Sequence, residues 1–110
     1  ETVVLTDGVF DAISAGAVTP AVASFGKSLS ARQISLLNAF KRVIFYWDLD
    51  AYPQAERYAS SLQSDCLVVL HCDGKDAGSR SFKENKSLIE SAVRFDSVDY
   101  EMFKLLEINS

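Results

Sequence analysis

Short apolar runs alternate along the chain with stretches in which apolar residues recur at helical spacing. The strand-like runs, rich in β-branched and aromatic residues, are residues 2–5, 20–24, 42–47 and 66–70. The third run is continuous and aromatic, which is typical of a strand covered on both faces. Helical spacing is found in residues 9–15, 34–40, 53–62, 82–93 and 98–108. The pattern therefore predicts strands and helices in regular alternation.

Three positions predict where helices begin. Ser30 is followed three residues later by Gln33, and Ser81 by Glu84, which is the pattern of a capping box. Pro53 suits the first turn of a helix, where its missing N–H has no partner to lose. We therefore expect helices to begin directly after Ser30 and Ser81 and around Pro53.

Strands joined through helices point to a parallel sheet, because a parallel pair needs a long crossover connection. The sequence predicts an α/β fold with a mostly parallel, Rossmann-like sheet of four strands and helices on both faces. A length of 110 residues suits a single domain with one core. We assign residues 1–95 to this domain and residues 96–110 to a C-terminal helix packed on it or extending from it.

Acidic residues follow three of the four predicted strands. They are Asp7 after the first strand, Asp48 and Asp50 after the third, and Asp73 and Asp76 after the fourth. The carboxyl ends of parallel strands meet at one edge, where α/β sheets bind ligands. Carboxylates gathered there must protonate or share a cation, and oxygen ligands without His or Cys favour Mg²⁺ or Mn²⁺ over zinc. The alternative is that these are ordinary turn residues, since Asp and Gly are both common in turns.

The composition is that of a folded chain with an excess of acid. Hydrophobic residues make up 48% and charged residues 24%, and 15 Asp and Glu against 11 Lys and Arg leave a net charge of -4. This balance speaks against a broad basic face for nucleic acid. No apolar run approaches the length of a membrane span, so we expect no membrane contact. Cys66 and Cys72 lack the partners of a zinc site, which favours reduced thiols and a cytoplasmic location. The chain starts at Glu1 rather than Met, as would suit part of a longer protein.

Four segments in order along the chain carry a resemblance to a known domain family. Residues 6–13, Thr-Asp-Gly-Val-Phe-Asp-Ala-Ile, resemble an opening Glu-Gly-aromatic-x-Asp motif, and residues 21–30 resemble an alanine-serine-glycine segment. Residues 43–50 are similar to a strand that ends in Asp-x-Asp, and residues 74–76, Gly-Lys-Asp, to the start of a Gly-x-Asp-Pro-Asp element. Such motifs belong to the Toprim domain of topoisomerases and primases, and the chain most closely resembles the version in DnaG-type primases of bacteria and phages.

The chain departs from the Toprim pattern at several positions. Asp7 stands where the family has Glu, Leu49 and Pro53 stand where primases usually have Gly, and Gly78 stands where a further Asp is common. Asp is one methylene shorter than Glu, so the carboxylate of Asp7 would reach the same target only if its loop moved inward.

The resemblance implies a metal-dependent phosphoryl-transfer centre. Asp7, Asp48 and Asp50 would be the catalytic residues, and these three with Asp76 would bind Mg²⁺ or Mn²⁺. Asp11, on the first predicted helix, would support them as a neighbouring partner. The implied function is the metal-binding core of a DNA primase, a nucleotidyltransferase that makes RNA primers for DNA replication.

Basic residues near this edge are candidates for phosphate contacts, although charges on helix surfaces are mostly solvated. They are Lys27, Lys75, Arg80 and Lys83. The resemblance also implies single-stranded DNA template, RNA primer and nucleoside triphosphates as partners of the full-length protein, with a replicative helicase as another. A primase further needs a neighbouring subdomain and often a zinc-binding module, so we expect the isolated domain to be inactive.

Other functions stay open. Within the resemblance, the chain could be a Toprim-type metal-dependent nuclease or a degenerate module that binds partners without catalysis. A haloacid dehalogenase phosphatase usually follows its Asp-x-Asp with Gly and Thr on the first strand, whereas Ala51 and Tyr52 follow here on the third. A receiver domain needs paired acids after its first strand, where only Asp7 is present. His71 ends the fourth strand, where a single histidine gives little support to an acid–base role.

Overall fold

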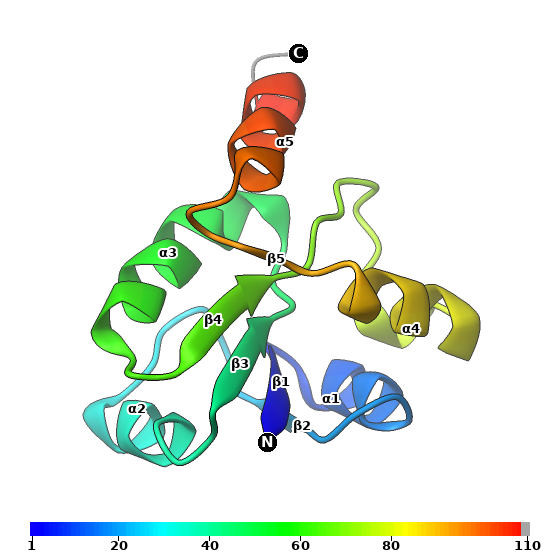
Figure 1. The fold of residues 1–110 in the computed structure, drawn as a ribbon. Helices are drawn as coiled ribbons and strands as arrows, with labels where there is room; N and C mark the ends of the chain where they lie inside the picture. The colour runs from blue at the N-terminus through cyan, green and yellow to red at the C-terminus, as the bar shows by residue number, and fades with distance from the viewer. Residues whose placement is uncertain (109–110) are drawn as a thin grey trace.

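A single mostly parallel sheet organises the computed structural model, which describes residues 1–108 (Figure 1). Its strands are β1 (Thr2–Thr6), β2 (Ala21–Ala23), β3 (Arg42–Phe45), β4 (Asp65–Val68) and β5 (Val93–Arg94). Their order in the sheet is β2-β1-β3-β4-β5, in which the first four strands are parallel and β5 is antiparallel to β4. The prediction of an α/β fold with a mostly parallel sheet is confirmed.

The sheet has one strand more than predicted. Val93, expected on the inner side of a helix, instead pairs with Val68 as part of β5. The preceding helix ends earlier than expected, at Glu90, which frees the following residues to turn back along β4. A strand of two residues is too short to show a periodic pattern. The prediction of four strands was therefore wrong at this edge.

The helices match the predicted positions closely. They are α1 (Val9–Gly16), α2 (Ala31–Leu37), α3 (Tyr52–Ser61), α4 (Phe82–Glu90) and α5 (Val98–Ile108), with short 3₁₀ turns η1 (Leu49–Ala51) and η2 (Ala77–Ser79). Both capping boxes are confirmed. The Ser30 hydroxyl accepts from the Gln33 N–H at 3.1 Å, and the Ser81 hydroxyl accepts from the Glu84 N–H at 3.1 Å. Pro53 lies in the first turn of α3, as expected.

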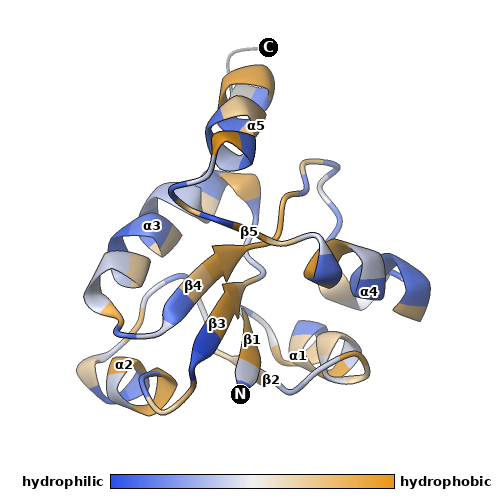
Figure 2. Cartoon of the chain, in the orientation of Figure 1, coloured by the Kyte–Doolittle hydropathy of each residue, from blue (hydrophilic) through white to orange (hydrophobic). Residues whose placement is uncertain are grey.

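The helices cover both faces of the sheet because the buried strands alternate between two cores. Val43 and Phe45 of β3 pack into the core that α2 and α3 cover, whereas Ile44 packs on the opposite side with Ala15 of α1 and Ile89 of α4. Figure 2 shows β3 and β4 as hydrophobic beyond their polar first residues, as burial on both faces requires. Helices on both faces are therefore confirmed.

Helix α5 is anchored to the sheet domain by its first turns and then stands out from it (Figure 1). Tyr100 is fully buried, with its ring centroid 5.2 Å from that of Phe95 and 5.9 Å from that of Tyr52. Its hydroxyl donates to the Glu56 carboxylate at 2.8 Å. In the described part of the chain, no helix has the length and apolar character needed to cross a membrane.

Candidate metal and phosphate site

Two of the predicted site acids meet at a lysine. Asp7 and Asp48 follow β1 and β3, which are neighbours in the sheet, so parallel pairing brings the two acids to one edge. The Lys27 ammonium lies 3.1 Å from Asp7 Oδ2 and 3.6 Å from Asp48 Oδ2. All three side chains are partly exposed, at 30% for Asp7, 48% for Asp48 and 31% for Lys27. The edge therefore holds two carboxylates that share one cation.

The surroundings of Lys27 favour its charged form. Burial lowers the pKa of the Lys27 amine, but the hydrogen bond to Asp7 and the negative charges of Asp7, Asp48 and Asp50 outweigh burial, and the pKa is raised overall. Lys27 therefore stays protonated at neutral pH and acts as the counter-ion of this acidic group. The sequence predicted that Lys27 lies at this edge, but it did not predict that Lys27 lies between the two carboxylates.

Backbone hydrogen bonds fix the loop that carries Lys27. The N–H of Ser24 donates to the Thr6 carbonyl at 2.8 Å, and the N–H of Gly26 donates to the Asp7 carbonyl at 3.2 Å. These bonds continue the pairing of β1 with β2 beyond the ends of the strands. Phe25 adopts a φ of 62°, an uncommon conformation for a residue with a side chain, and is 77% exposed. The loop thus holds the backbone of Lys27 directly beside Asp7.

Asp48 contacts Lys27 and also lines a hollow in the surface. Its side chain makes no capping hydrogen bond to η1, which leaves the carboxylate available to a cation. The hollow has a volume of about 300 Å³ and is lined by Asp48, Leu49, Asp50, His71, Cys72 and Gly74. Asp50 is exposed at this hollow. Its negative charge helps to raise the pKa of Lys27, although the two side chains form no ion pair in the described part of the chain.

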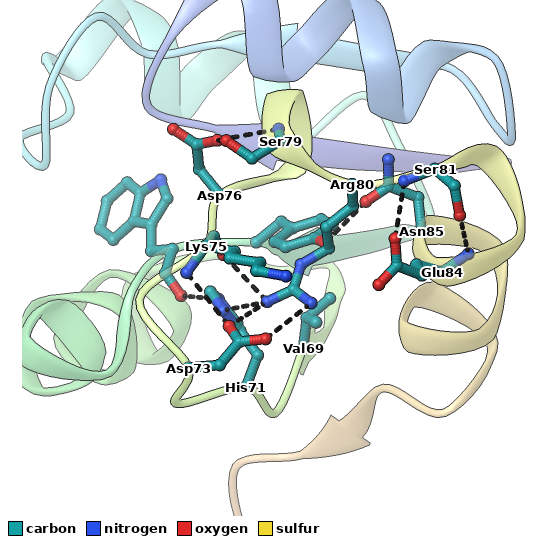
Figure 3. Close-up of polar contacts among 12 residues, drawn as sticks. Val69, His71, Asp73, Lys75, Asp76, Ser79, Arg80, Ser81, Glu84 and Asn85 are labelled. Atoms are coloured by element: carbon teal, nitrogen blue, oxygen red, sulfur yellow. Dashed lines mark hydrogen bonds and ion pairs between the residues drawn. The ribbon is translucent and has the colours of Figure 1, made fainter.

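Asp11 and Asp76 form a second acidic pair. Asp11 on α1 is only 9% exposed, and its Oδ1 accepts from the Gly78 N–H at 2.8 Å. Burial raises the pKa of Asp11, the hydrogen bond from Gly78 opposes this, and the charges of Asp76 and Asp7 raise the pKa further. Asp76 accepts from the N–H and hydroxyl of Ser79 at 3.1 and 3.0 Å (Figure 3). Asp11 therefore lies close enough to Asp76 and to Asp7 for their charges to affect its pKa.

The glycine at position 78 is explained by this second pair. A Cβ there would lie 3.0 Å from Asp11 Oδ1 and 3.6 Å from Asp76 Oδ1. A larger residue at this position would push the Asp11 carboxylate away from the Gly78 N–H that it accepts from. The absence of a further Asp at position 78 is thus consistent with a buried Asp11 in this chain.

Arg80 is occupied by internal partners rather than directed to solvent. Its guanidinium binds Asp73 Oδ1 at 2.5 Å and Oδ2 at 3.1 Å, and its Nη2 donates to the Lys75 carbonyl at 2.9 Å (Figure 3). The side chain is 5% exposed, and the pKa of Asp73 is lowered mainly by its hydrogen bonds from Arg80. A phosphate contact by Arg80 would require the guanidinium to leave these partners. Lys75 and Lys83 are exposed on the same loop and on α4.

The contacts of His71 are those of a residue with a structural role. Arg80 Nη2 lies 3.3 Å from His71 Nδ1, and a guanidinium can only donate, so Nδ1 accepts. The ring proton is then on Nε2, which donates to the Trp47 carbonyl at 3.0 Å. His71 therefore joins the ends of β3 and β4, which accounts for its burial at 6% exposure.

The donor set suits a divalent cation held by few protein ligands. Across residues 1–108, no three His, Cys, Asp or Glu side chains lie together closely enough to hold a metal by themselves. Mg²⁺, however, is commonly bound through one or two carboxylates, with water and substrate phosphate completing the octahedron. Asp7 and Asp48 offer only carboxylate oxygens, and they already share the positive charge of Lys27. This pair fits the chemistry of Mg²⁺ or Mn²⁺.

The fold and this edge define a Rossmann-like α/β protein with an acidic group beyond the carboxyl ends of its parallel strands. Comparison of the chain with protein-family models gave no match, and comparison with curated proteins gave no significant match. The resemblance to the Toprim domain therefore stays a prediction.

Proposed function

We propose that this chain is the Toprim-like, metal-binding core of a DNA primase, which supports template-directed synthesis of RNA primers as part of a larger protein. The observation that carries the proposal is the convergence of Asp7 and Asp48, from the ends of two adjacent parallel strands, on one positive charge. The four ordered motifs of the sequence are its second support.

In this proposal the protein supplies ligands and charge at one edge of the sheet. Asp7 and Asp48 would hold Mg²⁺ or Mn²⁺, with Asp50 beside them at the hollow. The bound cation would stabilise negative charge on the attacking and leaving oxygens of phosphoryl transfer. Asp76 would be a further ligand of the cation, and the buried Asp11, whose charge couples to those of Asp76 and Asp7, would support them as a neighbouring partner.

The remaining parts of the reaction come from outside this chain. Single-stranded DNA template, RNA primer and nucleoside triphosphates would meet the edge in the full-length protein, with a replicative helicase as a further partner. Lys27, Lys75 and Lys83 are partly or fully exposed lysines that would contact phosphates there. A cytoplasmic location belongs to the same proposal.

A second candidate is a degenerate Toprim-like module that binds partners without catalysis. One observation favours it, because Lys27 already neutralises part of the charge of Asp7 and Asp48. In such a module the lysine would permanently take the place of a metal ion, and the acidic edge would be a structural or docking feature.

Primer synthesis by the full-length protein distinguishes the two candidates. We expect Asp48→Asn and Asp50→Asn to reduce incorporation of labelled nucleotides by about a hundredfold or more, because a neutral amide is a poor ligand for Mg²⁺. Asp7→Ala should also reduce synthesis, whereas Asp7→Glu should retain or raise it, since it restores the residue of the motif. Asp99→Asn, an exposed acid on α5, is the control.

Unchanged synthesis in the Asp48→Asn and Asp50→Asn proteins would exclude the catalytic proposal and favour the binding module. Metal-dependent nicking of DNA without nucleotide addition would instead identify a nuclease. Both readouts use the same set of variants and the same Asp99→Asn control.

A further inference from the structure

Lys27 occupies the position at which Asp7 and Asp48 would share a metal ion. Its ammonium is within 4 Å of one oxygen from each carboxylate. The hydrogen bond from Gly26 to the Asp7 carbonyl keeps the lysine backbone next to the site. An ammonium and a divalent cation cannot both lie between the same two oxygens, because like charges at this separation repel strongly.

The side chain of Lys27 can leave the site without disturbing the fold. It is 31% exposed, so it has a path to solvent, and its four-carbon stem has several rotatable bonds. The preceding Gly26 has a φ of 132°, and no atom lies within 4 Å of the position that a Cβ would take there. Displacing the ammonium therefore breaks two partly exposed ion pairs and leaves the hydrogen bonds of the loop intact.

We propose that Lys27 is a built-in counter-ion that competes with the divalent cation for Asp7 and Asp48. Without metal, the ammonium holds the two carboxylates together and keeps the edge assembled. When the cation binds, the ammonium is displaced toward solvent, where it is available to a phosphate that approaches the same edge. This inference rests on the proposed function in one respect, namely that a divalent cation binds at Asp7 and Asp48.

The inference predicts opposite effects of Lys27 on metal affinity and on the stability of the metal-free chain. Removing the positive charge should tighten Mn²⁺ binding about tenfold, since one like charge near the ion is lost. The same change should lower the melting temperature of the metal-free chain, because Asp7 and Asp48 then repel each other without a counter-ion. Added Mn²⁺ should restore that loss. An ordinary surface ion pair would not produce this combination.

The test compares the wild-type chain with Lys27→Met, Lys27→Arg and Lys41→Met. Lys27→Met keeps most of the side-chain length without its charge, and Lys27→Arg keeps the charge. Lys41→Met is the matched control, since Lys41 is exposed immediately before β3, at the opposite edge of the sheet, and its loss changes the net charge equally. Mn²⁺ is titrated at low salt while paramagnetic broadening of backbone amide signals is followed, and melting is measured with and without Mn²⁺.

We expect broadening around residues 7 and 48 in every chain, at about tenfold lower Mn²⁺ concentration in Lys27→Met than in the other three. The difference should shrink at high salt because the lysine is partly exposed. Equal affinity in Lys27→Met and wild type, with broadening still at residues 7 and 48, would overturn the competition and leave the proposed metal site standing. Weaker binding in Lys27→Met would also overturn it, since the lysine would then support the metal. Absence of localised broadening in all four chains would refute the metal site itself, and the competition with it.

Discussion

Replacing Asn85 should destabilise the chain more than its size suggests, because this residue joins three elements beside the candidate site. Asn85 on α4 is 1% exposed, and its Oδ1 accepts from the Tyr46 hydroxyl at 2.7 Å. Its Nδ2 donates to the carbonyl of Ala77 at 3.1 Å, in the η2 turn that directly follows Asp76. Burial raises the pKa of Tyr46 to about 12, so its hydroxyl remains a donor through the neutral range. Asn85 thus connects the residue after β3, helix α4 and the η2 turn that follows Asp76.

The expected loss follows from the partners that Asn85→Ala would leave behind. Each of the two hydrogen bonds contributes about 1 kcal/mol net, and a buried polar group without a partner costs about 1–3 kcal/mol. We therefore expect a decrease of about 2–4 kcal/mol in the free energy of unfolding. Tyr46→Phe removes one hydroxyl and leaves Asn85 Oδ1 without its donor, so its cost should be about 1–2 kcal/mol. Relative to a total of about 5–15 kcal/mol for a domain, the larger loss is readily measured.

Urea denaturation of the two single variants and the double variant measures these losses and their coupling. The two changes share a hydrogen bond, so the double variant should cost less than the sum of the single ones, by at least about 0.5 kcal/mol. Asn38→Ala is the control, because Asn38 Oδ1 accepts from the Gln63 N–H at an exposed position and should contribute about 1 kcal/mol or less. A loss below about 0.5 kcal/mol for Asn85→Ala, or strict additivity with Tyr46→Phe, would refute this account of the buried contact.

Two further predictions concern titratable groups. Burial raises the pKa of Asp11, so its ionised form weakens the fold. The stability linked to its protonation is fully present below its ordinary value of 3.8 and is lost as the pH rises through the raised value. Asp11→Asn, which keeps an acceptor for Gly78, should therefore be more stable relative to wild type at pH 7 than at pH 4. An equal difference in urea midpoint between the two proteins at pH 4 and at pH 7 would contradict this. Burial also raises the pKa of the Cys66 thiol to about 11. A hydrogen bond with Glu107 raises the pKa of Cys72 too, but Cys72 is exposed, so iodoacetamide at pH 8 should modify Cys72 first, as mass spectrometry would show. Equal rates at the two cysteines would be incompatible with the burial of Cys66.

The elements that local chemistry determines could be predicted from the sequence. Ser30 and Ser81 each precede a residue whose side chain can return to the serine N–H, and both helices begin there. The parallel sheet followed from the connections between strands, which are long enough for crossovers. The meeting of Asp7 and Asp48 at one edge then required only that their strands be parallel neighbours.

The pairing of charges at the edge could not be predicted in the same way. Nothing in the sequence distinguishes the surroundings of three basic residues in or near loops at the carboxyl edge, namely Lys27, Arg80 and Lys75. Their different surroundings depend on contacts between residues far apart in the chain, such as that of Lys27 with Asp48 and that of Arg80 with His71. Periodicity carries no information on such contacts, because they are set by how far each loop folds back over the sheet. The burial of Asp11 under Gly78 could not be predicted from the sequence for the same reason.

The division of charge has a consequence for how the edge can meet a nucleic acid. Arg80 is neutralised by Asp73 and largely buried, so it contributes little to the potential outside the protein. Lys27 lies between Asp7 and Asp48, and its single charge does not balance two carboxylates. The edge therefore remains acidic even with its own lysine in place. A polyanion would be repelled there until a divalent cation reduces the negative charge and displaces Lys27 toward the approaching phosphate. In the proposed function, metal binding and nucleic-acid binding would for this reason depend on each other, and the isolated chain without metal should bind single-stranded DNA poorly.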